Sequence, residues 1–154
     1  MNKSTIPRRA QSLVEFAIVA PLFFLLIMGV LDFGRLFFTQ MTLQNALRQA
    51  GRYAVTGNHL ADPKNAGQTL SRVASIQQIA QKAAVGLDVG NISVSSDKAG
   101  LGSAGGPGDT VTITLNHDLQ LITPIIGHFF NGGVYHFTVS TSFKNEPFSP
   151  SSTE

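Results

Sequence analysis

The sequence contains no cysteine, and this absence narrows the chemistry open to it. Disulfide bridges, thiolate zinc sites and cysteine nucleophiles are all excluded. The redox compartment is left open, because an oxidising compartment permits disulfides without requiring them. Charged residues are also sparse, at 13% of the chain, and no basic patch interleaved with aromatic residues occurs. A nucleic-acid partner is therefore not expected.

The motifs of common catalytic and metal sites are missing as well. The glycine-rich stretch Lys98–Asp109 lacks the Gly-Lys-Ser/Thr of a phosphate loop, so we interpret it as a flexible loop. Asp97 and Asp109 flank this stretch and are candidate calcium ligands, but no EF-hand spacing is present. No HExxH spacing links the candidate nitrogen ligands, which are His59, His117, His128 and His136. We expect no catalytic residue, no metal and no cofactor, and we interpret the chain as a non-enzyme.

The few charges are distributed unevenly. Residues 1–57 carry six Lys/Arg against two Asp/Glu, a net charge of +4, whereas residues 58–154 carry five against seven, a net charge of −2. The excess of positive charge lies around one long apolar run, where cations flank a membrane span or face lipid headgroups.

The apolar run extends from Leu13 to Leu31 and contains one charged residue, Glu15. A helix of this length reaches about 28 Å, close to the roughly 30 Å hydrocarbon thickness of a bilayer. Lys3, Arg8 and Arg9 precede the run, so the positive-inside rule predicts a cytoplasmic N-terminus and an extracytoplasmic C-terminal part. A cleaved secretory signal is the competing interpretation, but no small-x-small cleavage site follows the run.

Glu15 is the most informative residue of this segment. A carboxylate inside an apolar helix costs about 2.5–3.5 kcal/mol on insertion scales, so a partner is expected to neutralise it. The alternative is that Glu15 lies at headgroup depth, where the cost is smaller.

The segment Arg-Arg-Ala-Gln-Ser-Leu-Val-Glu-Phe-Ala at residues 8–17, the apolar run and the Asp-Phe-Gly-Arg at residues 32–35 together resemble a TadE-like pilus-assembly protein. Such proteins are pilin-like components of Tad (Flp) type IV pilus systems. The resemblance implies that a prepilin peptidase cuts after Ala10, that Gln11 becomes the new N-terminus, and that Glu15 is the fifth residue of the mature chain. It implies that Glu15 is an assembly determinant, paired with the α-amino group of a neighbouring subunit's Gln11.

The resemblance further implies a minor pilin or pseudopilin that takes part in assembling a Tad-type pilus used in adhesion or surface attachment. The implied partners are other pilin-like subunits, Tad assembly components, the prepilin peptidase and the lipid bilayer. The implied location is the bacterial inner membrane, or a pilus that incorporates the chain. The first alternative is a permanently anchored, unprocessed envelope protein that binds a partner or surface. The second is a membrane-tethered enzyme, which no catalytic constellation supports.

Beyond the run, the helical pattern continues to about Val55, where Gly57 can cap it. We interpret the residues Asp32, Phe33, Gly34 and Arg35 as a membrane-exit motif in which Asp32 and Arg35 form an i, i+3 pair. The apolar seam of this helix packs either on its own domain or on other subunits. Pro21 is expected to bend the helix. The seam residues are Phe33, Leu36, Gln40, Leu43, Leu47, Ala50 and Ala54.

The remaining residues predict an α+β domain. An alanine-rich helix is expected between Leu70 and Leu87, and strands are expected at Ile92–Val94, Thr110–Leu115 and Tyr135–Phe143, with a short helix or buried loop inside Leu119–Phe130. The fold class is α+β: a long N-terminal helix with a transmembrane first half, a second helix and a small antiparallel sheet of about three strands. The expected organisation is 1–10 leader, 11–31 transmembrane helix, 32–57 helix extension, 58–146 extracytoplasmic domain and 147–154 flexible tail.

Overall fold

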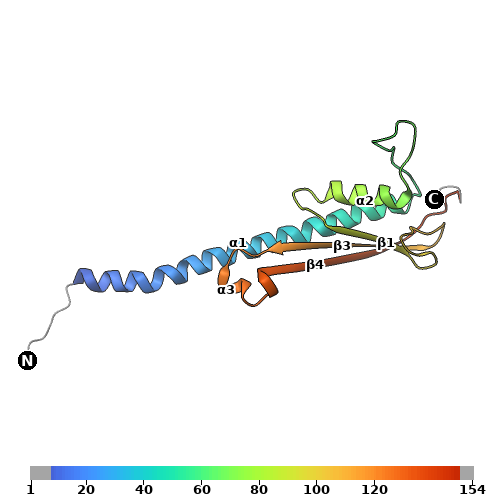
Figure 1. Cartoon of the computed structure of the whole chain (residues 1–154). Coiled ribbons are helices and arrows are strands. Elements are labelled where there is room, and N and C mark those ends of the chain that lie inside the picture. The colour runs from blue at the N-terminus through green and yellow to red at the C-terminus, as the bar shows by residue number, and fades with distance from the viewer. Residues whose placement is uncertain (1–7, 150–154) are drawn as a thin grey trace, which may run out of the picture. The chain divides into compact units, whose positions relative to one another are not determined.

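The computed structural model describes residues 8–149, except for the side chains of residues 8–10, 124, 125 and 131. Most of the expected leader lies outside the described residues. Within residues 8–149, three α-helices, one 3-10 helix and four strands follow one another (Figure 1). They are α1 (Arg8–Ala54), α2 (Arg72–Ala83), β1 (Asn91–Ser96), β2 (Gly100–Leu101), β3 (Thr110–Gln120), α3 (Pro124–Gly127), η1 (Asn131–Gly133) and β4 (Val134–Lys144). The predicted α+β class is confirmed.

The chain divides into two compact units. The N-terminal unit consists of the chain up to Leu36 and of Gln120–Val134. The sheet unit takes Phe37–Leu119 and the chain from Tyr135 onward. Helix α1 contributes its first part to the N-terminal unit and its last part to the sheet unit.

Helix α1 contains 47 residues and is helical through Pro21. It ends where predicted, because Gly57 adopts a φ of +70°, a conformation that side-chain-bearing residues rarely take. Within the sheet unit, the last part of the predicted seam is buried inside the chain itself, at Leu43, Leu47, Ala50 and Ala54. This part of the seam therefore builds the domain's own core.

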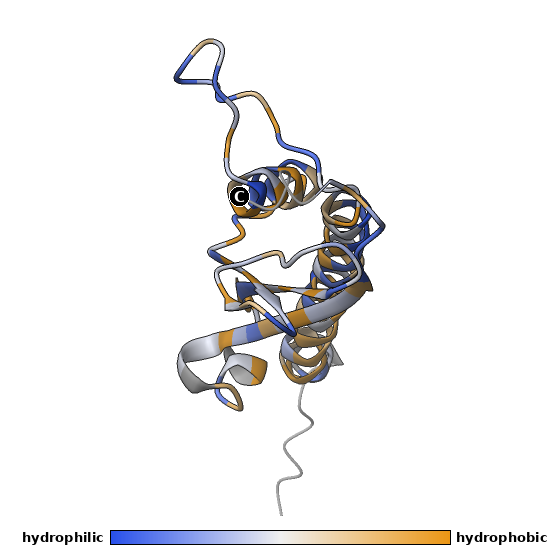
Figure 2. Cartoon of the chain, turned by 90° about the vertical axis from the view of Figure 1, so that its right-hand side faces the viewer, coloured by the Kyte–Doolittle hydropathy of each residue, from blue (hydrophilic) through white to orange (hydrophobic). Residues whose placement is uncertain are grey.

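Helix α2 begins at a polar cap and closes the core of the sheet unit. The Ser71 hydroxyl accepts a hydrogen bond from the Ala74 N–H at 3.2 Å, which satisfies a free donor of the first turn. Ile76 and Ala80 are buried, and the Gln77 side chain donates to the Ile92 carbonyl of β1 at 2.9 Å. Helices α1 and α2 lie side by side on one face of the sheet (Figure 2).

The sheet has the order β2-β1-β3-β4, with β1 antiparallel to β2 and β3. Alternation is clearest in β3, where Val111, Ile113 and Leu115 are buried. The intervening hydroxyls meet those of β4: Thr112 and Ser142 lie 2.8 Å apart, and Thr114 donates to Ser140 at 3.1 Å. These pairs run in opposite directions along the chain, so β3 and β4 are antiparallel. The predicted apolar and threonine faces of this strand are confirmed.

The sequence-based count of about three strands was one too low. The additional strand, β2, contains two residues and pairs Leu101 with Ser95. It lies inside the glycine-rich stretch that was interpreted as a flexible loop. Such a short strand is set by the hairpin that contains it and leaves no alternating pattern in the sequence.

Candidate functional site

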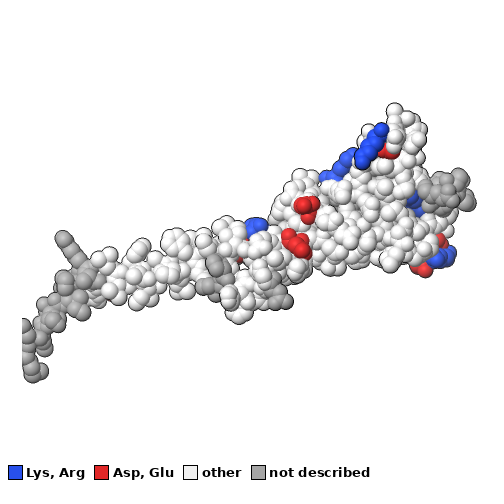
Figure 3. All heavy atoms as spheres, in the orientation of Figure 1, with Lys and Arg blue, Asp and Glu red and all other residues white. Residues whose placement is uncertain are grey.

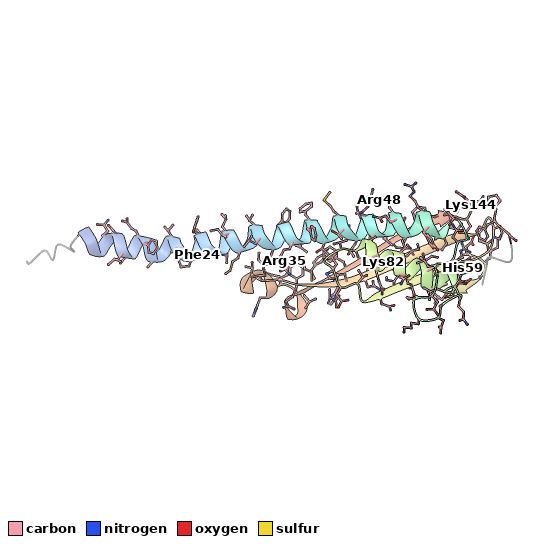
Figure 4. All side chains as sticks on the ribbon, turned by 90° about the horizontal axis from the view of Figure 1, so that it is seen from above. Phe24, Arg35, Arg48, His59, Lys82 and Lys144 are labelled. Atoms are coloured by element: carbon pink, nitrogen blue, oxygen red, sulfur yellow. The ribbon has the colours of Figure 1, made fainter. Side chains whose placement is uncertain are left out.

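The first half of α1 presents an apolar surface that the chain does not cover. In the described structure, the most apolar 18-residue window of the helix has no buried residue, and Leu13 is 69% exposed. The side chains around Phe24 radiate from the helix, and no other element of the N-terminal unit lies beside them (Figure 4). On the face shown in Figure 3, this half of α1 is white, without a charged side chain. Such a helix is long and apolar enough to cross a membrane.

Glu15 lies on this surface, and its carboxylate is solvent-exposed in the isolated chain. The Gln11 side-chain amide donates a hydrogen bond to Glu15 Oε1 at 3.1 Å, one helical turn away. This contact places the two residues singled out by the sequence on one side of α1. Ala10 belongs to the same helix, but its side chain is outside the described residues. The peptide bond between Ala10 and Gln11 thus lies within α1.

Asp32 directly follows the apolar run and is a buried, hydrogen-bonded side chain of the N-terminal unit. It is 2% exposed, although carboxylates are almost never fully buried without partners. The Ile122 N–H donates to its two oxygens at 2.9 and 3.1 Å, and the Thr123 N–H donates at 2.8 Å. Strand β3 ends at Gln120, so these two N–H groups lie outside the sheet and need an acceptor.

Arg35 completes this arrangement. Its guanidinium lies 3.7 Å from the Asp32 carboxylate, so the expected i, i+3 pair is present. It also donates to the Gln120 carbonyl at 3.0 Å. The other two residues of the motif, Phe33 and Gly34, do not take part in these contacts: Phe33 is exposed, and a Cβ on Gly34 would meet nothing within 4 Å. The motif therefore contains Asp32, which binds the segment after β3, Arg35, which binds the last residue of β3, and two residues that lie on the helix surface.

Sequence reasoning found Asp32 and Arg35 but not the segment that they bind. Ile122 and Thr123 follow the aspartate by 90 and 91 residues, and no local spacing encodes such a contact. The one signal was chemical: a carboxylate at the end of an apolar run needs donors, and the N–H groups that follow a strand can supply them.

Three of the four candidate histidines, and Asp97, contact protein groups, whereas His128 is exposed. His59 lies 2.9 Å from the Leu70 carbonyl, His117 lies 2.7 Å from the Asp88 carbonyl, and His136 lies 2.6 Å from Asp118. Asp97 accepts a hydrogen bond from the Thr110 N–H at 2.9 Å. Among the described residues, no three His, Cys, Asp or Glu side chains form a metal-binding group.

Asp109 is held by Lys98, whose ammonium lies 2.6 Å from the carboxylate. The hydrogen bond from Lys98, together with that from the Gly106 N–H, lowers the pKa of Asp109 below its ordinary value. The same contact raises the pKa of Lys98. The two residues that flank the glycine-rich stretch therefore close it as an ion pair.

Arg72 is the principal buried charge of the sheet unit, and no sequence pattern indicated its role. It is 1% exposed; its guanidinium donates to the Gly105 carbonyl and, at 2.8 Å, to the Ala54 carbonyl at the end of α1. The ring of Phe148 lies 4.6 Å from it. Burial lowers the pKa of Arg72, and the charge of Asp109 partly opposes this shift. Arg72 joins the end of α1, the glycine-rich stretch and the segment after β4.

Asn145 reinforces the same junction. Its side-chain amide donates to the Ala104 carbonyl at 2.9 Å and to the Gly106 carbonyl at 2.8 Å. The Glu146 N–H donates to the Val55 carbonyl at 3.0 Å. Backbone carbonyls of the glycine-rich stretch thus accept hydrogen bonds from both Arg72 and Asn145. These bonds hold the backbone of the stretch in one conformation.

These features define a class of protein: an α+β domain carried on one uncovered apolar helix, as in a single-pass membrane protein. The comparison with protein families then identifies the helix, because residues 10–52 match the family of TadE-like proteins. The match confirms the resemblance that the sequence motif carries, and the chain is similar to TadE-like proteins over residues 10–52. The match ends before α2 and the sheet. No curated protein and no solved structure gave a significant match.

Proposed function

We propose that the protein is a prepilin-like minor pilin or pseudopilin that takes part in assembling a Tad-type pilus, used in adhesion or surface attachment. One observation carries this proposal: the TadE-like helix is uncovered over its apolar half and bears a single exposed carboxylate, Glu15. A lipid bilayer explains the apolar surface but not the carboxylate. Packing against other pilin-like subunits explains both.

In this proposal the leader is removed on the cytoplasmic side. Lys3, Arg8 and Arg9 hold the N-terminus in the cytoplasm of the bacterial inner membrane, and a prepilin peptidase cuts between Ala10 and Gln11. Cleavage changes the formal charge of the chain from +2 to −1 and creates a cationic amine at Gln11. The amine of one subunit then neutralises Glu15 of the next, so two charges enter the helix bundle as a pair.

The surface of α1 in the sheet unit supports a helix-to-helix contact that extends beyond the membrane. Phe38 and Met41 are exposed one turn apart, and they line a shallow cavity together with Arg48 and Val85. Exposed apolar groups that gather in this way mark interaction surfaces. The other Tad assembly components are the partners that this surface would meet.

Intact-mass measurement and N-terminal sequencing of the membrane-extracted protein test the proposal. In a host with the prepilin peptidase, the chain is expected to begin at Gln11; in a host without it, the chain keeps residues 1–10. An Ala10→Leu variant is the matched control, because a bulky residue before the cut should leave the leader in place. A chain that keeps Met1 in the competent host favours the permanently anchored, unprocessed envelope protein instead.

The orientation is tested separately. A phosphatase reporter fused after Glu154 should be active outside the cytoplasm. If the phosphatase could act on its substrate only after the cells were broken open, the C-terminus would be cytoplasmic and the assigned topology would be reversed.

A further inference from the structure

We propose that the segment between β3 and β4, Leu121–Gly133, inserts its apolar side chains into the lipid interface beside the end of the α1 span. We call this segment the β3–β4 connector. It would be a second membrane contact of the chain, separate from the span. The proposal requires α1 to cross the membrane, but it does not depend on peptidase processing or on pilus assembly.

The first argument is position, because the connector belongs to the N-terminal unit and is bound along the end of the apolar run. A Cβ on Gly29 would lie 3.6 Å from the Ile126 side chain, so α3 contacts α1 two residues before Leu31. Asp32 binds Ile122 and Thr123, and Arg35 binds the residue before the connector. Helix positions 29, 32 and 35 span about 9 Å along the axis. The connector therefore lies level with the boundary between hydrocarbon and headgroups.

The second argument is composition. No Asp, Glu, Lys or Arg occurs between Asp118 and Lys144, so the connector carries no fixed charge. Phe129 is 83% exposed and Ile122 is 52% exposed. Large apolar side chains are unfavourable in water and favourable at the headgroup boundary. The exposed His128 supplies a polar group suited to this depth.

The third argument is the backbone, because a segment can enter lipid only if its N–H groups are satisfied internally. The Ile122 and Thr123 N–H groups are bound by Asp32. The others that are accounted for donate to carbonyls of the same segment at 2.8–3.1 Å: Leu121 to Gly133, Gly127 to Thr123, Phe129 to Ile126, Phe130 to Gly127 and Gly133 to Phe130. Seven of the twelve N–H groups of the connector therefore have acceptors in the connector itself or in the Asp32 carboxylate.

Single-tryptophan fluorescence tests the proposal, because the chain contains no tryptophan. The full chain is reconstituted into phosphatidylcholine–phosphatidylglycerol vesicles that contain lipids brominated either near the headgroup or deep in the acyl chain. Phe129→Trp is the probe. Leu101→Trp is the matched control, because Leu101 is 86% exposed but lies on β2 in the sheet unit. Phe23→Trp reports the span.

The Phe129→Trp emission is expected to be blue-shifted and quenched at least twofold more by the shallow bromines than by the deep ones, whereas Leu101→Trp stays unquenched. Equal, weak quenching of Phe129→Trp and Leu101→Trp would overturn the proposal. A Phe129→Trp that is shielded from acrylamide but not quenched by brominated lipid would also overturn it, in favour of a protein contact. Loss of quenching at Phe23→Trp would instead show that the span itself is wrong, and the connector proposal would fall with it.

Discussion

The Asp32 carboxylate accepts a hydrogen bond at 2.8 Å from the backbone N–H of Thr123, a residue 91 positions later in the chain. This contact joins the end of the apolar helix to the segment that follows β3. It gives the aspartate of the TadE-like motif a structural task within its own chain: it supplies the acceptor for two N–H groups that have left the sheet.

Replacing Asp32 by alanine should release this segment. The Ile122 and Thr123 N–H groups would lose their acceptor, and an unsatisfied buried donor costs about 1–3 kcal/mol. Amide hydrogen exchange of the detergent-solubilised chain should accelerate at these two residues. Arg35→Gln is the matched control: its partly exposed ion pair contributes at most about 1 kcal/mol, so exchange should change little. Unchanged exchange in Asp32→Ala would contradict this role.

Arg72 should stabilise the sheet unit through the planar shape of its guanidinium group as well as through its charge. Arg72→Lys keeps the charge but cannot reach the Ala54 and Gly105 carbonyls with one planar group, so we expect a loss of about 1–3 kcal/mol in the free energy of unfolding. Urea unfolding followed by tyrosine fluorescence reports this unit, because its two tyrosines, Tyr53 and Tyr135, both lie there. Arg48→Lys, at an exposed site, should leave the midpoint unchanged. Equal midpoints for the two variants would refute the role of Arg72.

Gly51 is required by the close approach of β4. A Cβ at this position would lie 1.9 Å from the Phe143 ring, so Gly51→Ala should destabilise the sheet unit by roughly 1–3 kcal/mol despite the better helix propensity of alanine. Adding Phe143→Leu should recover part of the loss, because it makes room for the methyl group. Gly34→Ala is the control, since nothing lies within 4 Å of that position. A stabilised Gly51→Ala would show that the ring moves aside freely.

The ion pair of Asp109 and Lys98 predicts an acid-dependent loss of stability. The pKa of Asp109 is lowered from its ordinary 3.8, so its contribution is complete above that pH and is lost as the pH falls through the lower folded-state pKa. Lys98→Gln should shrink this loss and leave the pH dependence above 5 unchanged. Urea midpoints measured from pH 7 down to pH 2.5 check both statements. An identical acid profile in Lys98→Gln would contradict the assignment.

The elements that sequence reasoning located are those with regular periodicity. Helix α1, helix α2 and strands β1 and β3 each bury residues such as Leu47, Ile76 and Ile113 at helical or alternating spacing. Strand β4 was located from its alternating sequence, although it buries only Phe137. The two-residue β2 has no such pattern. The contacts of Arg72 and Asp32 were not predicted for a different reason. A lone arginine at the start of an alanine-rich helix does not specify which distant carbonyl it will bind, and an aspartate after an apolar run does not specify which distant N–H it will bind.

Some parts of the candidate site were likewise predictable from local sequence patterns, and others were not. The exposed apolar helix, Glu15 and the Asp32–Arg35 pair were all visible as residue types at local spacings. The β3–β4 connector was visible only as an apolar stretch around Pro124 that predicted a short helix or a buried loop. Its place beside Gly29 depends on tertiary packing, which a single sequence does not encode locally.

The proposed pairing of Glu15 with the amine created at Gln11 of another subunit can be tested by the incorporation of Glu15 variants into surface pili. Cleavage between Ala10 and Gln11 should be normal in both Glu15→Ala and Glu15→Gln, because neither change touches the cut bond. Both variants should nevertheless be lost from pili by more than a hundredfold, since breaking one partner of a buried pair typically costs about 3–5 kcal/mol. Glu15→Asp, which keeps the charge, should retain part of the incorporation. Normal incorporation of the cleaved alanine and glutamine variants would contradict the pairing and leave Glu15 as a tolerated interfacial carboxylate.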